Sequence, residues 1–141
     1  PLYDLGYTYL LQDDYVNALK YYLLTDKAAP NGFYTSKTAV NTLEKEKKGE
    51  LPQGLYKSYL SLEWIESESE KTEMIKLFID KYPAFAPAWK EYSNLLEGEE
   101  RLEAIEKGLA QNPDIETMGI LTINKALVLF QVKKVQYQSI N

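Results

Sequence analysis

The stretch that decides the fold is residues 2–30, LYDLGYTYLLQDDYVNALKYYLLTDKAAP. Apolar and small residues recur there at helical spacing on both sides of the pair Asp13 and Asp14. Because Asp side chains accept hydrogen bonds from free helix N–H groups, this pair is expected to end one helix and cap the next. Gly6 and Ala18 are small residues on otherwise bulky faces, which suits two backbones that approach closely. The stretch therefore predicts two short amphipathic helices folded back on each other.

Composition limits the classes of function that the chain can have. The chain has 141 residues, of which 45% are hydrophobic and 26% are charged, as in a folded protein with a real core. Its net charge of −5 argues against a nucleic-acid partner, which would need clustered Lys and Arg. The absence of Cys and His removes disulfides, thiol nucleophiles and the most common general base and metal ligand. No nucleophile-elbow, phosphate-loop or zinc-protease motif is present, so we expect no enzyme activity, cofactor or metal.

The sequence carries few signals for the cellular location of the protein. The longest apolar candidate runs from Ala126 to Val132, far short of about 18 residues, so we expect neither a membrane span nor a membrane partner. The lack of Cys and of a visible signal peptide favours the cytoplasm. Because the sequence begins at Pro1 rather than Met, we expect it to be a fragment of a longer chain.

The middle of the chain continues the helical pattern less regularly. Residues 33–48 predict an extra helix that is weakly apolar and is therefore expected to lie on the outside, with Gly49 as its C-cap. Residues 55–66 carry apolar side chains around a wide face, so that helix should be well buried. A polar turn then leads to a further helix, which we expect to start near Ser69 and to end at Tyr82.

The last part of the chain predicts another helix pair and a strongly apolar final helix. Pro87 suits a helix start, and residues 97–100 form the turn between the two helices of residues 85–113. Residues 115–132 are apolar nearly all round, so most sides of that helix must be covered. Residues 133–141 are interpreted as a turn and the first residues of a partner helix. Since no polar-faced capping helix follows, we expect the chain to continue or another subunit to cover this end.

The opening stretch resembles a tetratricopeptide repeat (TPR). The residues that carry the resemblance are Leu2, Leu5, Gly6, Tyr9, Asp14, Tyr15, Ala18, Tyr22 and Pro30. The resemblance implies one all-α domain over residues 1–141, a helical-hairpin repeat solenoid of about eight helices. Its parts are expected to be a repeat at 2–30, an extra helix at 33–48, a degenerate repeat at 55–83, a repeat at 85–113 and a partial repeat at 115–141.

In this family the first helix of each repeat lines a concave surface that holds peptides or partner helices. The resemblance therefore implies a protein–protein interaction scaffold. The expected groove face comprises Tyr3, Tyr7, Leu10 and Leu11 in the opening unit, and Ile120, Ile123, Leu127 and Phe130 in the final helix. The alternative is that neighbouring helices cover these faces. Two other roles stay open, an accessory domain of a larger regulator or enzyme and a homo-oligomer formed through the uncapped C-terminal end.

Some TPR proteins clamp the C-terminal carboxylate of a peptide with Lys and Asn side chains from successive repeats. Lys90, Asn94 and Asn124 match part of that set, and ammonium and amide donors can converge on an anion. The alternative is that these residues belong to ordinary solvated helix surface. The acidic turns at residues 66–70 and 97–100 lack the ligand pattern of a calcium loop and are predicted to be solvated.

Overall fold

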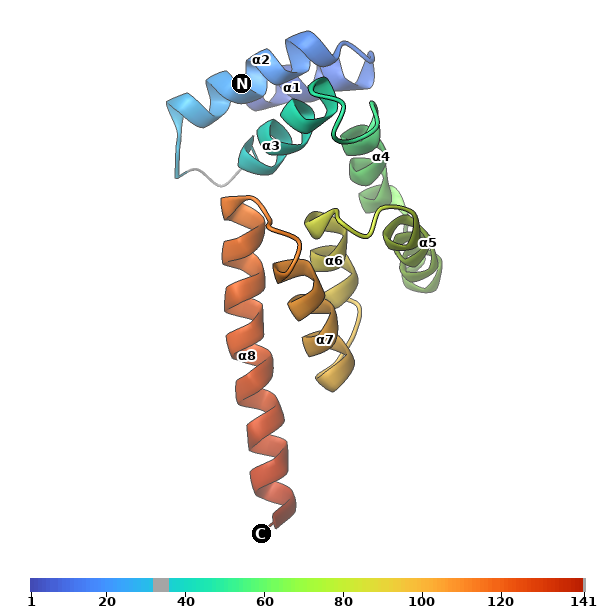
Figure 1. The fold of residues 1–141 in the computed structure, drawn as a ribbon, viewed down its shortest axis with the longest axis vertical. Helices are drawn as coiled ribbons and strands as arrows, with labels where there is room; N and C mark the ends of the chain where they lie inside the picture. The colour runs from blue at the N-terminus through green and yellow to red at the C-terminus, as the bar shows by residue number, and fades with distance from the viewer. Residues whose placement is uncertain (32–35, 141) are drawn as a thin grey trace. The chain divides into compact units, whose positions relative to one another are not determined.

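The computed structural model describes residues 1–31 and 36–140, the side chain of residue 140 excepted. That part of the chain is all α-helical and contains no strand, which confirms the predicted class and the predicted number of about eight helices (Figure 1). Its elements are α1 (Leu2–Leu11), α2 (Tyr15–Ala28), α3 (Ser36–Lys47), α4 (Leu55–Ser61), the 3-10 helix η1 (Leu62–Trp64), α5 (Glu68–Lys81), α6 (Ala86–Ser93), α7 (Gly98–Leu109) and α8 (Ile115–Ile140). Where the sequence predicts one domain, internal contacts divide the chain into two compact units, Pro1–Trp64 and Ile65–Asn141.

The opening helices α1 and α2 form the predicted hairpin. Asp13 adopts a left-handed backbone conformation, with φ of 61°, and thereby ends the first helix. The Asp14 carboxylate accepts a hydrogen bond from the backbone N–H of Asn17 at 3.1 Å and caps α2. Gly6 lies against the ring of Tyr22, where an added Cβ would stand only 3.1 Å from the nearest ring atom. The predicted break, cap and close approach are all confirmed.

Aromatic side chains fill the centre of the first unit. Tyr22 is fully buried, and its ring meets the rings of Tyr3 and Tyr56 edge-on, with centroids 5.4 and 6.2 Å away. Burial raises the pKa of the Tyr22 hydroxyl far above its ordinary value. The unit therefore has a dense core although several of its core residues carry a hydroxyl group.

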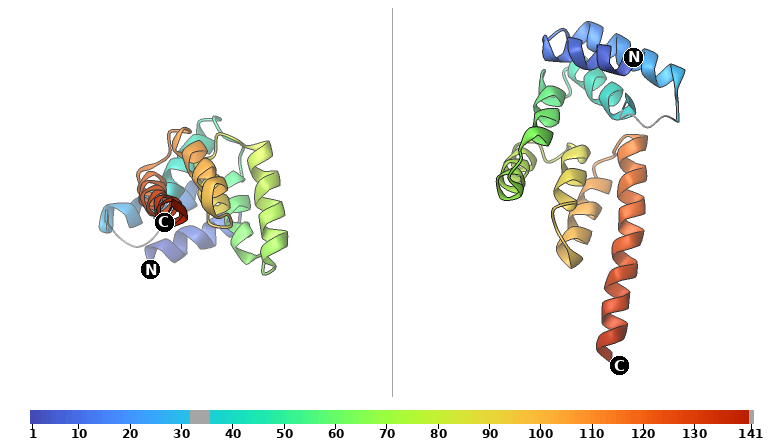
Figure 2. Two further views of the ribbon diagram at one scale, coloured as in Figure 1. Left: turned by 90° about the horizontal axis from the view of Figure 1, so that it is seen from below. Right: turned by 180° about the vertical axis from the view of Figure 1, so that it is seen from behind.

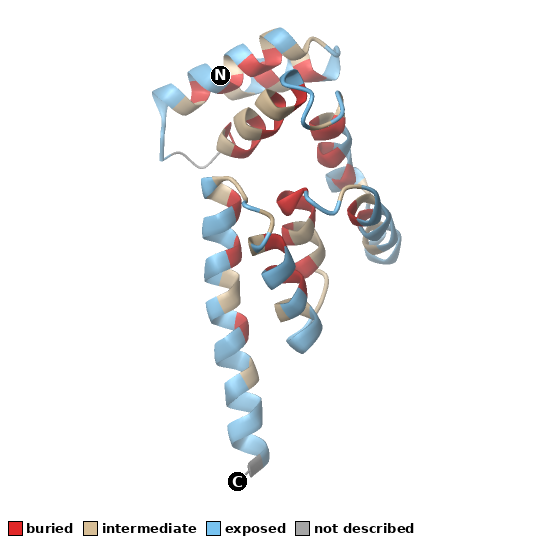
Figure 3. Cartoon of the chain, in the orientation of Figure 1, coloured by how far each residue is buried: buried red, intermediate tan, exposed pale blue. Residues whose placement is uncertain are grey.

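Helix α3 corrects the prediction of an outside helix. Half of its residues are buried, including the polar side chains of Thr38, Thr42 and Glu46 (Figure 3). The Thr42 hydroxyl donates a hydrogen bond to the carbonyl oxygen of Thr38, so this polar residue is buried with its hydrogen bond made. Phe33, which the sequence places in this helix, lies outside the described residues, whereas Gly49 follows the helix with φ of 79°, as a C-cap requires.

The segment predicted as one helix over residues 55–66 is α4 followed by the short 3-10 helix η1. Its apolar face is buried as predicted, except that Trp64 is largely exposed. In the second unit, α5 begins at Glu68 rather than near Ser69, because the hydroxyl of Ser67 caps it by accepting from the N–H of Glu70. Pro87 stands in the first turn of α6, as its missing N–H favours.

Helices α6, α7 and α8 pack together around Gly108. A Cβ at that position would lie 2.9 Å from Cβ of Trp89 on α6 and 3.0 Å from a methyl group of Leu121 on α8. The apolar contact between α7 and α8 is built on Ile105, Leu121 and Val128, which are all buried. Gly108 thus allows three helices to meet where a larger residue would push them apart.

Helix α8 is longer than predicted. The turn expected after residue 132 does not form, and the helix continues to Ile140, beyond the ends of α6 and α7 (Figures 1 and 2). Residues 133–139 contain no Gly, Pro, Asp or Asn, so nothing in them favours a break. At the other end, Asp114 accepts hydrogen bonds from the N–H and hydroxyl of Thr117. One consequence is that Ile115–Ser139 is, by length and composition alone, a helix that could cross a membrane, although no uninterrupted apolar run shows this in the sequence.

Candidate interaction surfaces

The predicted groove face of α1 is only partly exposed. Tyr3 and Tyr7 are half-buried, and Leu11 is 50% exposed. Leu10, by contrast, is completely buried, so its assignment to an exposed groove is wrong. The reason is that Gly6 and Leu10 lie one turn apart and together form the side of α1 that packs on α2. The available surface is therefore Tyr7 and Leu11, with the exposed part of Tyr3.

A second exposed strip on α1 was not predicted. Leu2 and Leu5, which the repeat pattern places in the core, are 36% and 43% exposed. Tyr9 on the same side stacks on Tyr21 of α2, with nearly parallel rings and centroids 5.4 Å apart. Since the apolar residues of α1 cover more of its circumference than α2 can bury, the sequence alone gives no signal for which of them face solvent.

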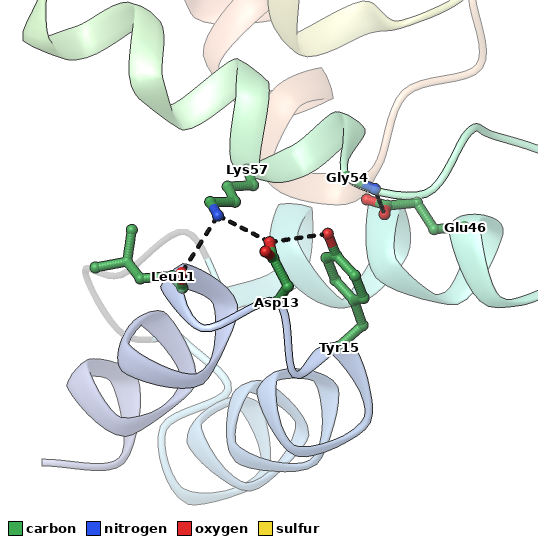
Figure 4. Close-up of polar contacts among 6 residues, drawn as sticks. All are labelled: Leu11, Asp13, Tyr15, Glu46, Gly54 and Lys57. Carbon is green, nitrogen blue, oxygen red and sulfur yellow. Dashed lines mark hydrogen bonds and ion pairs between the residues drawn. The ribbon is translucent and has the colours of Figure 1, made fainter.

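A polar network fixes the end of α1 within the first unit. The Lys57 ammonium donates to the carbonyl oxygen of Leu11 at 3.2 Å and to the Asp13 carboxylate at 2.8 Å, and the Tyr15 hydroxyl donates to Asp13 at 3.1 Å (Figure 4). The hydrogen bond from Lys57, followed by that from Tyr15, holds the pKa of the Asp13 carboxyl below its ordinary value. The Leu11 side chain points away from this network, which leaves it on the outer surface (Figure 4).

Glu46 joins α3 to the start of α4. Its carboxylate accepts hydrogen bonds from the backbone N–H groups of Gly54 at 2.6 Å and Tyr56 at 3.0 Å (Figure 4 shows the first). It thereby supplies the N-terminal cap that Gly54, which has no side chain, cannot provide. Burial raises the pKa of Glu46, and the two hydrogen bonds oppose that rise. Sequence reasoning missed this residue, because an acid eight residues before a helix carries no local capping signal.

The predicted carboxylate clamp is not assembled. Lys90 and Asn94 lie one turn apart at the end of α6, but Lys90 is buried and its ammonium is 3.5 Å from the Glu91 carboxylate. Asn94 is exposed, and Asn124 is half-buried on α8. In the described part of the chain, no hydrogen bond joins the side chains of these three residues. A buried ammonium that already has an acidic neighbour is not placed to receive a peptide carboxylate.

The outer face of α8 carries a strip of four exposed apolar side chains. Ile120, Ile123, Leu127 and Phe130 are 39%, 63%, 58% and 69% exposed. The same helix buries Leu121 and Val128 against α7 on its other side. Of the two alternatives left open for this face, the structure shows exposure, since no described helix of the second unit covers it. The expectation that most sides of this helix are covered is wrong, because α7 buries only the side that carries Leu121 and Val128.

A hollow of about 580 Å³ lies between the start of α7 and the second half of α8. Val128, Val132 and Val135 form its apolar wall, and Arg101 stands opposite. The Nε atom of Arg101 is buried and has no hydrogen-bond partner. The long Arg101 side chain thus lines the gap between the two helices.

No family model, curated protein or solved structure matches this chain. Within the described residues, no group of three or more acidic side chains is arranged to hold a metal ion. The exposed apolar surfaces of α1 and α8 are the candidate interaction surfaces of the chain.

Proposed function

We propose that this chain is a protein–protein interaction module, a TPR-like repeat solenoid that binds a peptide or a partner helix. The observation that carries the proposal is the amount of apolar surface left exposed on helices whose other faces are already packed. Contiguous exposed apolar surface of this kind marks binding sites for proteins and peptides. An amphipathic partner helix or extended peptide would place apolar side chains against it, with the helices packed behind that surface as its support.

The opening hairpin is the proposed peptide-binding element. The TPR resemblance of residues 2–30 is supported by the Asp14 cap and by the close approach of Gly6 to Tyr22. On this hairpin Tyr7 and Leu11 offer a half-exposed aromatic ring and a half-exposed aliphatic side chain. Aromatic residues of this kind contribute disproportionately to protein interfaces because they bury a large area with few rotatable bonds.

A displayed peptide library tests this proposal. Peptides selected by the intact chain should bind Tyr7→Ala and Leu11→Ala variants at least about tenfold more weakly, as expected for the loss of a central contact. Leu24→Ala is the matched control, since Leu24 is exposed on α2 and lies outside the proposed face. Equal binding by all three variants, with unchanged circular dichroism, would rule out the Tyr7–Leu11 surface.

A second candidate function, oligomerisation, is favoured by a different observation. The exposed residues Ile120, Ile123, Leu127 and Phe130 follow one another along α8 at alternating spacings of three and four. Such spacing is typical of a helix that pairs along its length with another helix.

A further inference from the structure

Helix α8 is apolar around most of its circumference and buries only one side. On one side Leu121 and Val128 are buried against Ile105 of α7. On the other, Ile120, Ile123, Leu127 and Phe130 are exposed. Each residue of an α-helix is rotated by about 100° around the helix axis from the one before it. Around that axis, the centre of the exposed side therefore lies more than a quarter of a turn from the side that contacts α7. A second helix could therefore pack on α8 without displacing α7.

The exposed side has the spacing of a coiled-coil seam and carries a charge at each end. Glu116 precedes the four apolar residues by one step of the same pattern, and Lys134 follows them by one step. We call Glu116, Ile120, Ile123, Leu127, Phe130 and Lys134 the α8 seam. The acid thus lies at the N-terminal end of the seam and the base at the C-terminal end.

The seam is complementary to itself when two copies run in opposite directions. We propose that the chain forms a homodimer by antiparallel pairing of the α8 seams, an inference that rests on the second candidate function. In this register Ile123 of one copy faces Leu127 of the other, and Ile120 faces Phe130. At both ends of the pair, Glu116 of one copy then faces Lys134 of the other.

Charge selects this arrangement over a parallel one. Parallel pairing in register would set Glu116 against Glu116 and Lys134 against Lys134, which is repulsive at both ends. Antiparallel pairing replaces both repulsions with attractions and also opposes the two helix dipoles favourably. Beside the centre of the seam lie Ala126 and Asn124, which are uncharged and bring no repulsion across the two-fold axis.

A lipid bilayer is a different occupant for the same helix, since its length and composition would allow it to span one. The packing of α8 favours a protein partner instead. Leu121 and Val128 are held against α7, and Lys125 approaches Glu106 of α7 with 3.9 Å between the charged atoms. The side held against α7 cannot face lipid, whereas the exposed side that carries the seam is open to a second helix.

Sedimentation of the full chain over a range of concentrations tests the proposal. We expect a monomer–dimer equilibrium whose dissociation constant rises about a hundredfold in Leu127→Glu, because the pairing would bury an unpaired charge. Ile115→Glu is the control: Ile115 is even more exposed than Leu127 but lies outside the seam, so dimerisation should be unchanged. A strict monomer at about 1 mM, where even weak association is visible, would overturn the proposal.

Charge reversal distinguishes the second copy from any other occupant. Glu116→Lys alone and Lys134→Glu alone should each weaken the dimer, and the double variant should regain the wild-type dissociation constant. Failure of the double variant to recover would contradict the antiparallel register. The chain could instead float as a monomer with vesicles of phosphatidylcholine and phosphatidylserine. If the Leu127→Glu variant no longer floated with them, the seam would be shown to bind a membrane, and the proposal would be refuted.

Cysteine cross-linking tests the register directly, because the natural chain has no cysteine. The double variant Ile120→Cys, Phe130→Cys should form a covalent dimer on mild oxidation, since antiparallel pairing brings the two positions of different copies together. Within one helix these positions are ten residues, or about 15 Å, apart and cannot bridge. Ile120→Cys alone should stay uncross-linked, and rapid dimer formation by that single variant would indicate parallel pairing instead. None of these measurements depends on peptide binding by α1, so the two proposals can fail separately.

Discussion

The α1–α2 hairpin and helix α8 are both rich in apolar residues but use them in different ways. In the hairpin, α2 and the following helices cover Leu10 and Tyr22 completely, so its core is closed within the first unit. In α8, only the side that faces α7 is closed, and Leu127 and Phe130 on the other side remain more than half exposed. Similar composition thus gives a self-contained hairpin in one place and an incomplete helix pair in the other. The contrast indicates which helix has room for a second helix along its length.

The two regions should differ most in how far the loss of one apolar side chain lowers the free energy of unfolding. Tyr22→Ala should lower the free energy of unfolding by about 3–5 kcal/mol, because a fully buried aromatic ring leaves a cavity. Leu127→Ala, measured in dilute solution where the chain is monomeric, should change it by less than about 0.5 kcal/mol. Urea unfolding followed by circular dichroism measures both. A loss of several kcal/mol in Leu127→Ala would mean that α8 is covered in the monomer and would break the comparison.

Substitutions of two glycines, one in the packed contact with α8 and one on α8 itself, test the packing of the second unit. Gly108→Ala should destabilise the second unit by roughly 1–3 kcal/mol, since the new Cβ would collide with Cβ of Trp89 and with Leu121. Gly119→Ala is the matched change on α8, where an added Cβ meets nothing within 4 Å. It should stabilise the helix by about 0.5–1 kcal/mol through the lower entropy of the unfolded chain. Thermal unfolding should therefore shift in opposite directions, and shifts of the same sign would contradict the packing around Gly108.

A smaller effect is expected from the polar cap that completes the first unit. Glu46→Ala should cost about 1–2 kcal/mol, because it removes the acceptor for two backbone N–H groups at the start of α4. Glu46→Gln keeps an oxygen acceptor and removes the charge. Burial raises the pKa of Glu46 in the folded state above its ordinary value of 4.5. Protonation of Glu46 therefore stabilises the folded state, fully so below pH 4.5, and this contribution is lost as the pH rises through the folded-state pKa.

Wild type should therefore gain stability relative to Glu46→Gln as the pH falls from about 7 toward 4.5. The carboxyl groups of Asp13 and Asp14, whose pKa values are lowered, act in the opposite direction but are common to both proteins and cancel in the difference. Urea midpoints measured for the two proteins across this pH range check the sign. A difference that is constant with pH would show that the Glu46 carboxyl titrates normally.

Local signals in the sequence were sufficient for the opening hairpin. Asp14 lies immediately before the helix it caps, and Gly6 needs only one partner, Tyr22, from the adjacent helix. The start of α6 at Pro87 is a local signal of the same kind. Features of this type depend on residues within one turn of each other or on the next helix along the chain, which is why pattern and spacing are enough to predict them.

Features that depend on distant residues were not predicted. Helix α3 looks like a surface helix in its sequence, yet Thr38, Thr42 and Glu46 are buried because their polar groups find partners in the fold. The face of α1 was misassigned at Leu10, since its helix has apolar residues around most of its circumference and only packing decides which are covered. The clamp predicted around Lys90 depended on a resemblance rather than on contacts, and the burial of Lys90 removes its main charge from solvent.

The length of α8 was underestimated for a related reason. The turn expected after residue 132 has no helix-breaking residue behind it, and the helix continues. With the helix continuing through Lys133 and Lys134, Lys134 falls in line with Leu127 and Glu116. A helix that ended at residue 132 would not include Lys134. The positive end of the α8 seam, which favours antiparallel pairing, was therefore not predicted from the sequence.

Hydrogen exchange at two protein concentrations tests the central contrast most directly. Amides of α2 in residues 18–25 should be equally protected in dilute and concentrated samples, because the hairpin core is closed within the monomer. Amides of α8 in residues 123–134 should become about tenfold or more better protected at the higher concentration, when the seams pair and local opening requires dissociation. Protection of α8 that does not change with concentration, up to the highest concentration the sample allows, would contradict the account.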